Sequence, residues 1–235
     1  MKYIISLVLV VTSLFSQEYY AKVEPIHTYN IKSSVSGKVI FANTNLEASI
    51  VKDTVVIKID DKINKIELAQ NRVKFTRMNK VLKIHKETLK SFNKVSSKSK
   101  FDKDKQKIVI LNSQVSLNDL RVRIETLKDT ISNKNIKLNN LYIQEIFVNN
   151  NDYINPGTLL IKALDLSEAK LEIFVSSSEI EDINKKEIYI DDKKSNLKIS
   201  KIYKTTDSKH LSSYKVEIIL SNVGQFSKLV KVSFK

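Results

Sequence analysis

Apolar residues recur at seven-residue steps through a long stretch, between Gly37 and Pro156, that contains no glycine or proline. These two residues cost most inside helices, so their absence favours long helices. The first apolar series consists of Leu68, Phe75, Leu82 and Leu89, with Met78, His85 and Phe92 three residues after the last three members. The second consists of Ile110, Leu117, Ile124, Ile131 and Leu138, with Leu120 and Leu127 three residues after two of them. This spacing predicts two helices that pack along a narrow seam.

The segment Ser91–Asp104, which contains the serine-rich piece from Val95 to Lys100, lies between the two series. Such a piece predicts a turn, and two helices joined by a short turn run antiparallel. We therefore assign residues 62–140 to a helical hairpin. At about 1.5 Å per residue, arms of about 34–38 residues each reach about 50–57 Å.

The segments on both sides of the hairpin have the composition of β-strands. The runs before it are Ile31–Phe41 and Thr54–Asp60, and those after it are Leu141–Val148, Thr158–Leu164 and Lys170–Val175. Strands that flank a long helical insertion predict one small β-domain, made of residues 23–61 and 141–168, whose two halves meet in space.

Positive charge is concentrated in the predicted hairpin. The chain has 40 basic and 26 acidic residues, a net charge of +14, and residues 62–140 contribute 20 basic and seven acidic residues, or +13. A narrow helical arm has almost no core, so its outer faces need charge to remain soluble. We therefore interpret most of these lysines as a solvated face or as a surface for an acidic protein partner, rather than as a nucleic-acid site.

The N-terminus predicts export. Met1 and Lys2 precede an apolar run from Tyr3 to Phe15, which is too short for a membrane-spanning helix of about 20 residues. We assign residues 1–16 to a signal peptide, with cleavage after Ser16. A first core strand and a retained signal anchor are the alternatives.

Catalytic, metal and cofactor sites are not indicated. The chain has no cysteine, no glycine-rich phosphate loop, and only the scattered histidines His27, His85 and His210. Met78 is the only methionine outside the signal segment, and we assign it to the helix seam rather than to a soft-metal site. The acidic pairs Asp60–Asp61 and Asp191–Asp192 end apparent strands, where aspartate is common in turns. We predict no catalytic, metal-binding or cofactor-binding residues.

The sequence resembles a known family, the periplasmic adaptor (membrane fusion) proteins of tripartite efflux pumps and type I secretion, also called the HlyD or RND-type adaptors. Residues 142–166 are similar to the second lipoyl half-motif, in which Pro156 and Gly157 form a type II turn. The opening strand Val35–Val39 and the strand Val51–Asp60 match the first half-motif, except that Asp53 replaces its turn glycine. Aspartate tolerates a left-handed conformation, so the fold is still expected.

The resemblance implies an α+β fold. A lipoyl-like β-sandwich is interrupted by a long antiparallel α-helical coiled-coil hairpin and is followed by a small β-barrel domain, residues 169–235 here. A biotin or lipoyl carrier shares the β-domain, but it needs its modified lysine on the turn that the helical arm replaces.

Members that dock on a TolC-like channel carry an arginine, a leucine, an aliphatic residue and a serine at fixed spacing near the hairpin tip. His85, Leu89, Val95 and Ser96 stand at this spacing, with histidine in place of arginine. The resemblance implies that Leu89 and Val95 contact the channel, that Ser96 hydrogen-bonds to its backbone, and that His85 lacks the full charge of arginine at neutral pH. Alternatively, Leu89 is the last seam residue and Ser96 caps the turn.

The function implied is that of a non-catalytic periplasmic adaptor between an inner-membrane transporter and a TolC-like outer-membrane channel. A homo-oligomeric ring is implied as well, without nucleic acid. The alternative is an exported coiled-coil scaffold or adhesin-like interaction protein, which needs export and helices but not the two-part β-domain.

Overall fold

The computed structural model describes residues 17–206, 209–221 and 223–235, so the predicted signal peptide, residues 1–16, lies outside the described residues. The chain forms two compact units. One is Tyr29–Ala163, and the other combines the described residues up to Thr28 with Leu164–Lys235. In the described residues, two long helices and three sheets give an α+β fold, as the sequence predicts. Within the part of the chain that the structure describes, no helix has the length and apolar character needed to cross a membrane.

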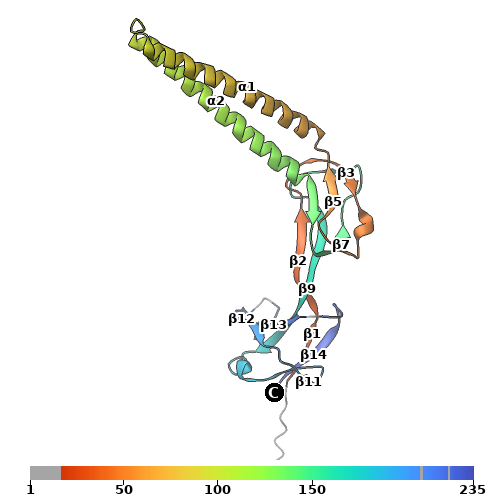
Figure 1. Cartoon of the computed structure of the whole chain (residues 1–235). Coiled ribbons are helices and arrows are strands. Elements are labelled where there is room, and N and C mark those ends of the chain that lie inside the picture. Colours follow the sequence, from red (N-terminus) through yellow and green to blue (C-terminus); the bar gives the residue numbers. More distant parts are fainter. Residues whose placement is uncertain (1–16, 207–208, 222) are drawn as a thin grey trace, which may run out of the picture. The chain divides into compact units, whose positions relative to one another are not determined.

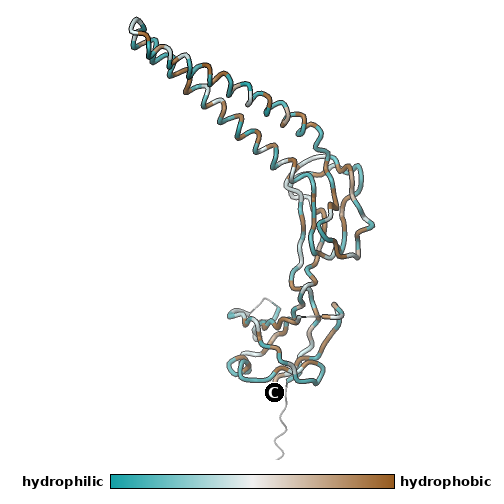
Figure 2. The backbone as a smooth tube through the Cα atoms, viewed as in Figure 1, coloured by the Kyte–Doolittle hydropathy of each residue, from teal (hydrophilic) through white to brown (hydrophobic). Residues whose placement is uncertain are grey.

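Two helices dominate the first unit, α1 (Lys62–Lys94) and α2 (Lys100–Asn133), joined by a five-residue turn (Figure 1). They run antiparallel, because Gln106 of α2 contacts His85 of α1 and Arg123 of α2 contacts Glu67 of α1. Apolar and polar residues alternate along both helices (Figure 2). The buried residues of α2 are Ile110, Ser113, Leu117, Ile124 and Leu127, four of which belong to the predicted seam.

The second helix ends earlier than the sequence suggested. Residues Asn135–Leu138 form strand β6, which pairs with β5 (Thr54–Ile59), so Leu138 is not a helix residue. Its side chain is buried in the β core, and Ile136 packs against the same core two residues earlier. An alternation of two positions is typical of a half-buried strand, and here it prevails over the seven-residue step.

The remaining strands of this unit come from both sides of the helices. They are β3 (Gly37–Ala42), β4 (Ile50–Val51), β7 (Leu141–Ile146), β8 (Tyr153–Ile154) and the start of β9 (Leu159–Ser176), with a short 3-10 turn, η1, at Thr44–Leu46. One sheet has the order β6-β5-β3-β8, and β4 pairs with β7. Val39 and Ile57 from the first segment share one core with Ile143 and Leu160 from the second. The two segments thus meet in space, as the sequence predicts.

The second unit is also built from distant segments. Its strands are β1 (Glu18–Lys22), β10 (Ile188–Ile190), β11 (Lys193–Lys194), β12 (Ile199–Thr206), β13 (Ser213–Ser221) and β14 (Leu229–Phe234), with the later part of β9 and the 3-10 turn η2 (Ile183–Lys185). One sheet has the order β1-β14-β10-β11, while β13 pairs with β9 and β12. Strand β2 (Glu24–Lys32) pairs with β9.

The first strand lies outside the bounds predicted from the sequence. We expected the β-structure to begin at residue 23 and the last domain to consist of residues 169–235 alone. Here β1 pairs with β14 near the other end of the chain, with Tyr20 opposite Lys231. Ala21 and Val23 are buried in the same core as Leu171 and Val232. Burial of these small apolar side chains explains why the first described residues join the C-terminal unit.

Candidate docking site at the helix tip

The tip of the helix pair consists of the end of α1, the turn from Val95 to Ser99 and the start of α2. Val95 ends α1 in an extended conformation, with 47% of its surface exposed. Its carbonyl oxygen accepts a hydrogen bond from the Lys98 N–H at 3.4 Å. Ser96 follows and is exposed. Two of the four predicted docking residues therefore lie together on an accessible turn.

His85 and Leu89 lie elsewhere, in the seam between the helices, and both are half-buried. The Gln106 side-chain amide donates to the His85 carbonyl oxygen at 3.0 Å, and its nitrogen lies 3.4 Å from His85 Nδ1. If Nδ1 accepts this contact, the ring carries its proton on Nε2. The His85 side chain is therefore held against α2. It does not project from the tip as a charged side chain that contacts a partner would.

The cap of α2 is Ser99 rather than Ser96. Ser99 Oγ accepts a hydrogen bond from the Asp102 N–H at 3.1 Å and donates to Asp102 Oδ2 at 3.0 Å. A serine three residues before an acidic residue is a local signature of a helix start, so the sequence contained this signal. The side-chain cap at the start of α2 is therefore Ser99, while the sequence had suggested a capping role in this turn for Ser96.

Two aromatic residues at the tip, Phe92 and Phe101, were not among the predicted docking residues. Phe101, in the first turn of α2, is 74% exposed. Phe92, near the end of α1, lies under the Lys98 ammonium, with 4.7 Å between Nζ and the ring centroid. Phe101 adds to Val95 a second exposed apolar group near the turn.

The tip is positively charged. Residues 90–107 contain seven lysines and two aspartates, a net charge of +5. The hydrogen bond from Lys107 to Asp104, at 2.9 Å, and the charge of that lysine hold the pKa of the Asp104 carboxyl below its usual value. Both aspartates are engaged within α2, Asp102 with Ser99 and Asp104 with Lys107, so the tip presents exposed apolar groups among lysines.

The predicted turn at Pro156 and Gly157 lies between β8 and β9, and a hydrogen bond joins it to the first segment of the β core. Gly157 has φ of +89°, and the Thr158 N–H donates to the Asn155 carbonyl at 3.0 Å. The Gly157 N–H also donates to the Ser33 carbonyl at 2.7 Å. In the other half, Asp53 has φ of +48°, the left-handed conformation for which a glycine was expected.

The two acidic pairs have structural contacts. Asp61 pairs with Lys65 at 2.8 Å at the start of α1, and Asp60 Oδ1 accepts from the Lys62 N–H at 3.0 Å. Asp191 and Asp192 occupy a turn with φ of +47° and +65°. The Lys231 N–H and the Lys228 ammonium both donate to Asp191 and lower its pKa, and Asp192 pairs with the Lys231 ammonium at 2.7 Å.

No family model matches the sequence, and a search of curated proteins finds no match. Solved structures do resemble it. The membrane fusion protein Spr0693 from Streptococcus pneumoniae R6 superposes with a TM-score of 0.72 and 10% identity, over 94% of this chain and 99% of that one. A MacA–MexA chimera with the Pseudomonas aeruginosa MexA α-hairpin domain gives a TM-score of 0.70 and 15% identity, over 94% and 78%.

A putative efflux transporter from Bacteroides eggerthii gives a TM-score of 0.67 and 12% identity, over 93% of this chain and 68% of that one. These similarities extend over both compact units and the helix pair. The chain therefore has the α+β fold found in solved membrane fusion proteins and efflux adaptors.

Proposed function

We propose that this chain is a non-catalytic periplasmic adaptor that links an inner-membrane transporter to a TolC-like outer-membrane channel. The observation that carries the proposal is the insertion of an antiparallel helix pair between two segments of one β core, with an exposed apolar and basic tip. A subunit that spans a gap between two membrane proteins needs such an arm, whereas a globular enzyme does not.

The proposed domains follow the adaptor arrangement. The lipoyl-like β-sandwich is formed by the strands of Tyr29–Ala163, and the coiled-coil hairpin is formed by α1 and α2. The small β-barrel is formed by Leu164–Lys235 together with the described residues up to Thr28. Residues 1–16 act as the export signal. The mature chain resides in the periplasm, reaches the inner membrane through the transporter, and assembles as a ring of identical subunits.

We propose that docking on the channel uses Val95 and Ser96 directly, with Leu89 and His85 supporting the tip from the seam. Burial of the exposed Val95 side chain contributes most to the binding free energy when the side chain enters an apolar groove between the helices of the partner. Ser96 supplies a hydroxyl that can donate to or accept from the partner's backbone. The +5 charge of residues 90–107 favours an acidic rim around that groove.

The test is recovery of the channel and the transporter with the full-length tagged chain after crosslinking in cells. Val95→Asp places a charge on the exposed turn and is expected to abolish channel recovery while transporter recovery remains. Leu89→Asp is expected to do the same, but it also enters the seam, so helix content must be checked by circular dichroism. Leu211→Asp is the matched control, because Leu211 is 78% exposed and belongs to the other unit.

Undiminished channel recovery with Val95→Asp and with Leu89→Asp would show that the tip is not the docking site. Failure of the unaltered chain to recover any transporter or outer-membrane channel would reject the adaptor role. An exported scaffold or adhesin would then be the better assignment.

A further inference from the structure

The C-terminal unit contains a pocket that the proposed function does not use. It has a volume of about 710 Å³ and opens to solvent. Its lining residues come from two short segments. Residues 183–188 include η2 and the start of β10, and residues 194–199 run from the end of β11 to the start of β12. The volume lies within the range of about 300–1,000 Å³ that is typical of sites for small organic ligands.

Backbone pairing fixes the two segments relative to each other. The Ser195 N–H and the Ser195 hydroxyl both donate to the Ile188 carbonyl oxygen, each at 2.9 Å. Glu187 exchanges two backbone hydrogen bonds with Lys235, at 2.8 and 3.1 Å, which continue the pairing of β10 with β14. The walls of the pocket are therefore held by the same sheet that carries the core of this unit.

The inner side of the pocket is aliphatic. Ile183 and Ile188 are 2% and 3% exposed, and Leu197 and Ile199 are half-buried and pack against the same core. None of the described residues that line the pocket is aromatic. This side therefore favours an alkyl chain, whereas a planar ring would find no aromatic side chain on which to stack.

The rim of the pocket is basic. It carries three exposed lysines, Lys186, Lys194 and Lys198. Glu187 is the only acidic lining residue, so the net charge is +2, and it pairs with the Lys194 ammonium at 2.6 Å. The other two lysines form no ion pair with any residue that the structure describes. The charge of Lys186 also acts on Asp182, but Asp182 pairs with Lys185 at 2.7 Å. Two ammonium groups of the rim are thus available to an anion.

We propose that this pocket binds a small amphipathic anion, a carboxylate with an alkyl chain of medium length. The chain covers the aliphatic side and displaces water from it. The carboxylate lies at the rim, where Lys186 and Lys198 donate charge-assisted hydrogen bonds to it. A cation of the same shape is disfavoured by the net charge of +2. The inference does not depend on the proposed function, because it concerns a ligand site in the C-terminal unit and not the helix tip.

Isothermal titration calorimetry of the full chain with decanoate, below the concentration at which it forms micelles, tests the proposal. We expect saturable binding at one site. Octanoate is expected to bind about fourfold to fifteenfold more weakly, because two methylene groups fewer are buried. Decyltrimethylammonium, which has an alkyl chain of similar length but a positive head group, is expected not to bind.

The double variant Lys186→Gln with Lys198→Gln removes both unpaired charges from the rim. We expect it to weaken decanoate binding at least about fivefold. Lys193→Gln is the matched control, because Lys193 is an exposed lysine of β11 that does not line the pocket, and its affinity should equal that of the unaltered chain. Leu197→Ser removes part of the aliphatic side and should reduce the difference between decanoate and octanoate. Circular dichroism checks that each variant is folded.

Equal binding of decanoate and decyltrimethylammonium would overturn the proposal, and so would an unchanged affinity in the double lysine variant. Binding of the unaltered chain to vesicles of phosphatidylcholine and phosphatidylglycerol, without binding of decanoate, would assign the basic rim to a membrane surface and would also overturn it. Channel and transporter recovery is independent of these results. Failure of the titration would therefore reject the ligand site alone and leave the adaptor role standing.

Discussion

The Lys134 ammonium donates a hydrogen bond to the Asp60 carbonyl oxygen at 2.6 Å, and this bond joins the two ends of the helix pair at its base. Asp60 lies just before α1 and Lys134 just after α2. The same ammonium donates to Asn64 Oδ1 at 2.7 Å, and the Lys134 carbonyl accepts from the Ile59 N–H at 2.8 Å. The residue is 9% exposed, so this link is shielded from water.

Replacement of Lys134 by methionine is expected to weaken this link. Methionine retains the length of the side chain but leaves the Asp60 carbonyl and the Asn64 amide without their charged donor. Hydrogen bonds of this kind contribute about 1.5–3 kcal/mol, so the free energy of unfolding in urea should fall by about this amount. Lys128→Met is the matched control, because Lys128 forms an exposed ion pair with Glu125, and the expected loss is below about 1 kcal/mol. Equal losses in the two variants would contradict the role given to Lys134.

Gly37 is expected to tolerate no side chain. Its φ is +153°, and a Cβ atom built there lies 2.6 Å from Ile59 Cγ2, a side chain that is 1% exposed. Gly37→Ala should therefore cost about 1–3 kcal/mol through overpacking, measured by thermal or urea unfolding. Gly224→Ala serves as the comparison, because nothing lies within 4 Å of its Cβ position, and we expect no loss of stability. If Gly37→Ala had the stability of the unaltered chain, the prediction would be wrong, and the Ile59 side chain would be able to move away from the added methyl group.

The sequence predicts the presence of the two helices and their seam residues, but it predicts the residues at which the helices end less well. Ile110, Leu117 and Ile124 are buried where the seven-residue repeat places them. Leu138 continues the same count but belongs to a strand, because a four-residue segment is too short for periodicity to separate the two structures. Strand β1 was missed because its partner, β14, is more than 200 residues away in sequence. No local pattern encodes such a pairing.

The tip was predicted only in part for a related reason. The serine-rich segment predicts that Val95 and Ser96 lie in a turn, whereas their docking role is implied by the family resemblance and stays a prediction. Ser99 could have been found from its spacing to Asp102. The exposure of Phe101 depends on which face of α2 packs against α1. Phe101, Ile108, Val115 and Val122 follow the same seven-residue step as the seam residues, so the repeat alone does not identify the buried face. The contact between His85 and Gln106 depends on the register of the two helices, which only the packed pair defines.

Tyr19 gives the C-terminal unit a sensitivity to alkaline pH. Its hydroxyl donates to Glu179 Oε2, and its ring packs edge-on against Phe234 with 5.9 Å between centroids. Burial raises the pKa of Tyr19 above its ordinary value of about 10, and the hydrogen bond to Glu179 and its negative charge raise it further. The folded state therefore favours the neutral phenol. This stabilisation is complete below about pH 10 and is lost as the pH rises from there through the folded-state pKa.

The Tyr19→Phe variant tests this assignment. At pH 7 we expect a loss of about 1–3 kcal/mol in the free energy of unfolding, since a hydrogen bond to a charged group is removed. Between pH 9 and pH 11 the difference from the unaltered chain should narrow, because phenylalanine does not titrate. Tyr20→Phe, on the same strand but 64% exposed, should change stability little at pH 7. If the difference in unfolding free energy between the two proteins stayed constant across this pH range, ionisation of Tyr19 would not contribute to stability, and only its packing and hydrogen bond would.

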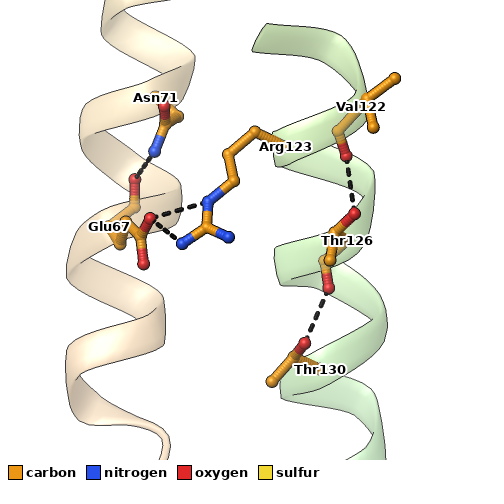
Figure 3. Close-up of polar contacts among 6 residues, drawn as sticks. All are labelled: Glu67, Asn71, Val122, Arg123, Thr126 and Thr130. Carbon is orange, nitrogen blue, oxygen red and sulfur yellow. Dashed lines mark hydrogen bonds and ion pairs between the residues drawn. The ribbon is translucent and has the colours of Figure 1, made fainter. Parts of the chain in front are cut away.

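Asn71 interrupts the seam of the helix pair with a buried amide. It is 9% exposed on α1, and its Nδ2 donates to the Glu67 carbonyl of the same helix at 2.8 Å, next to the ion pair between Glu67 and Arg123 (Figure 3). The amide is thus satisfied within α1. A polar residue at a seam position lowers the stability of a helix pair while it restricts the register.

We therefore expect Asn71→Leu to stabilise the helices by about 1 kcal/mol or more, because the leucine buries additional apolar surface in the seam. Thermal unfolding followed by circular dichroism at a helix-sensitive wavelength measures the effect. Asn79→Leu makes the same exchange at an exposed position of α1 and controls for helix propensity, which contributes only a few tenths of a kcal/mol. If Asn71→Leu were instead destabilising while Asn79→Leu was neutral, the seam would have no room for leucine, and the amide at position 71 would be required by packing rather than by register.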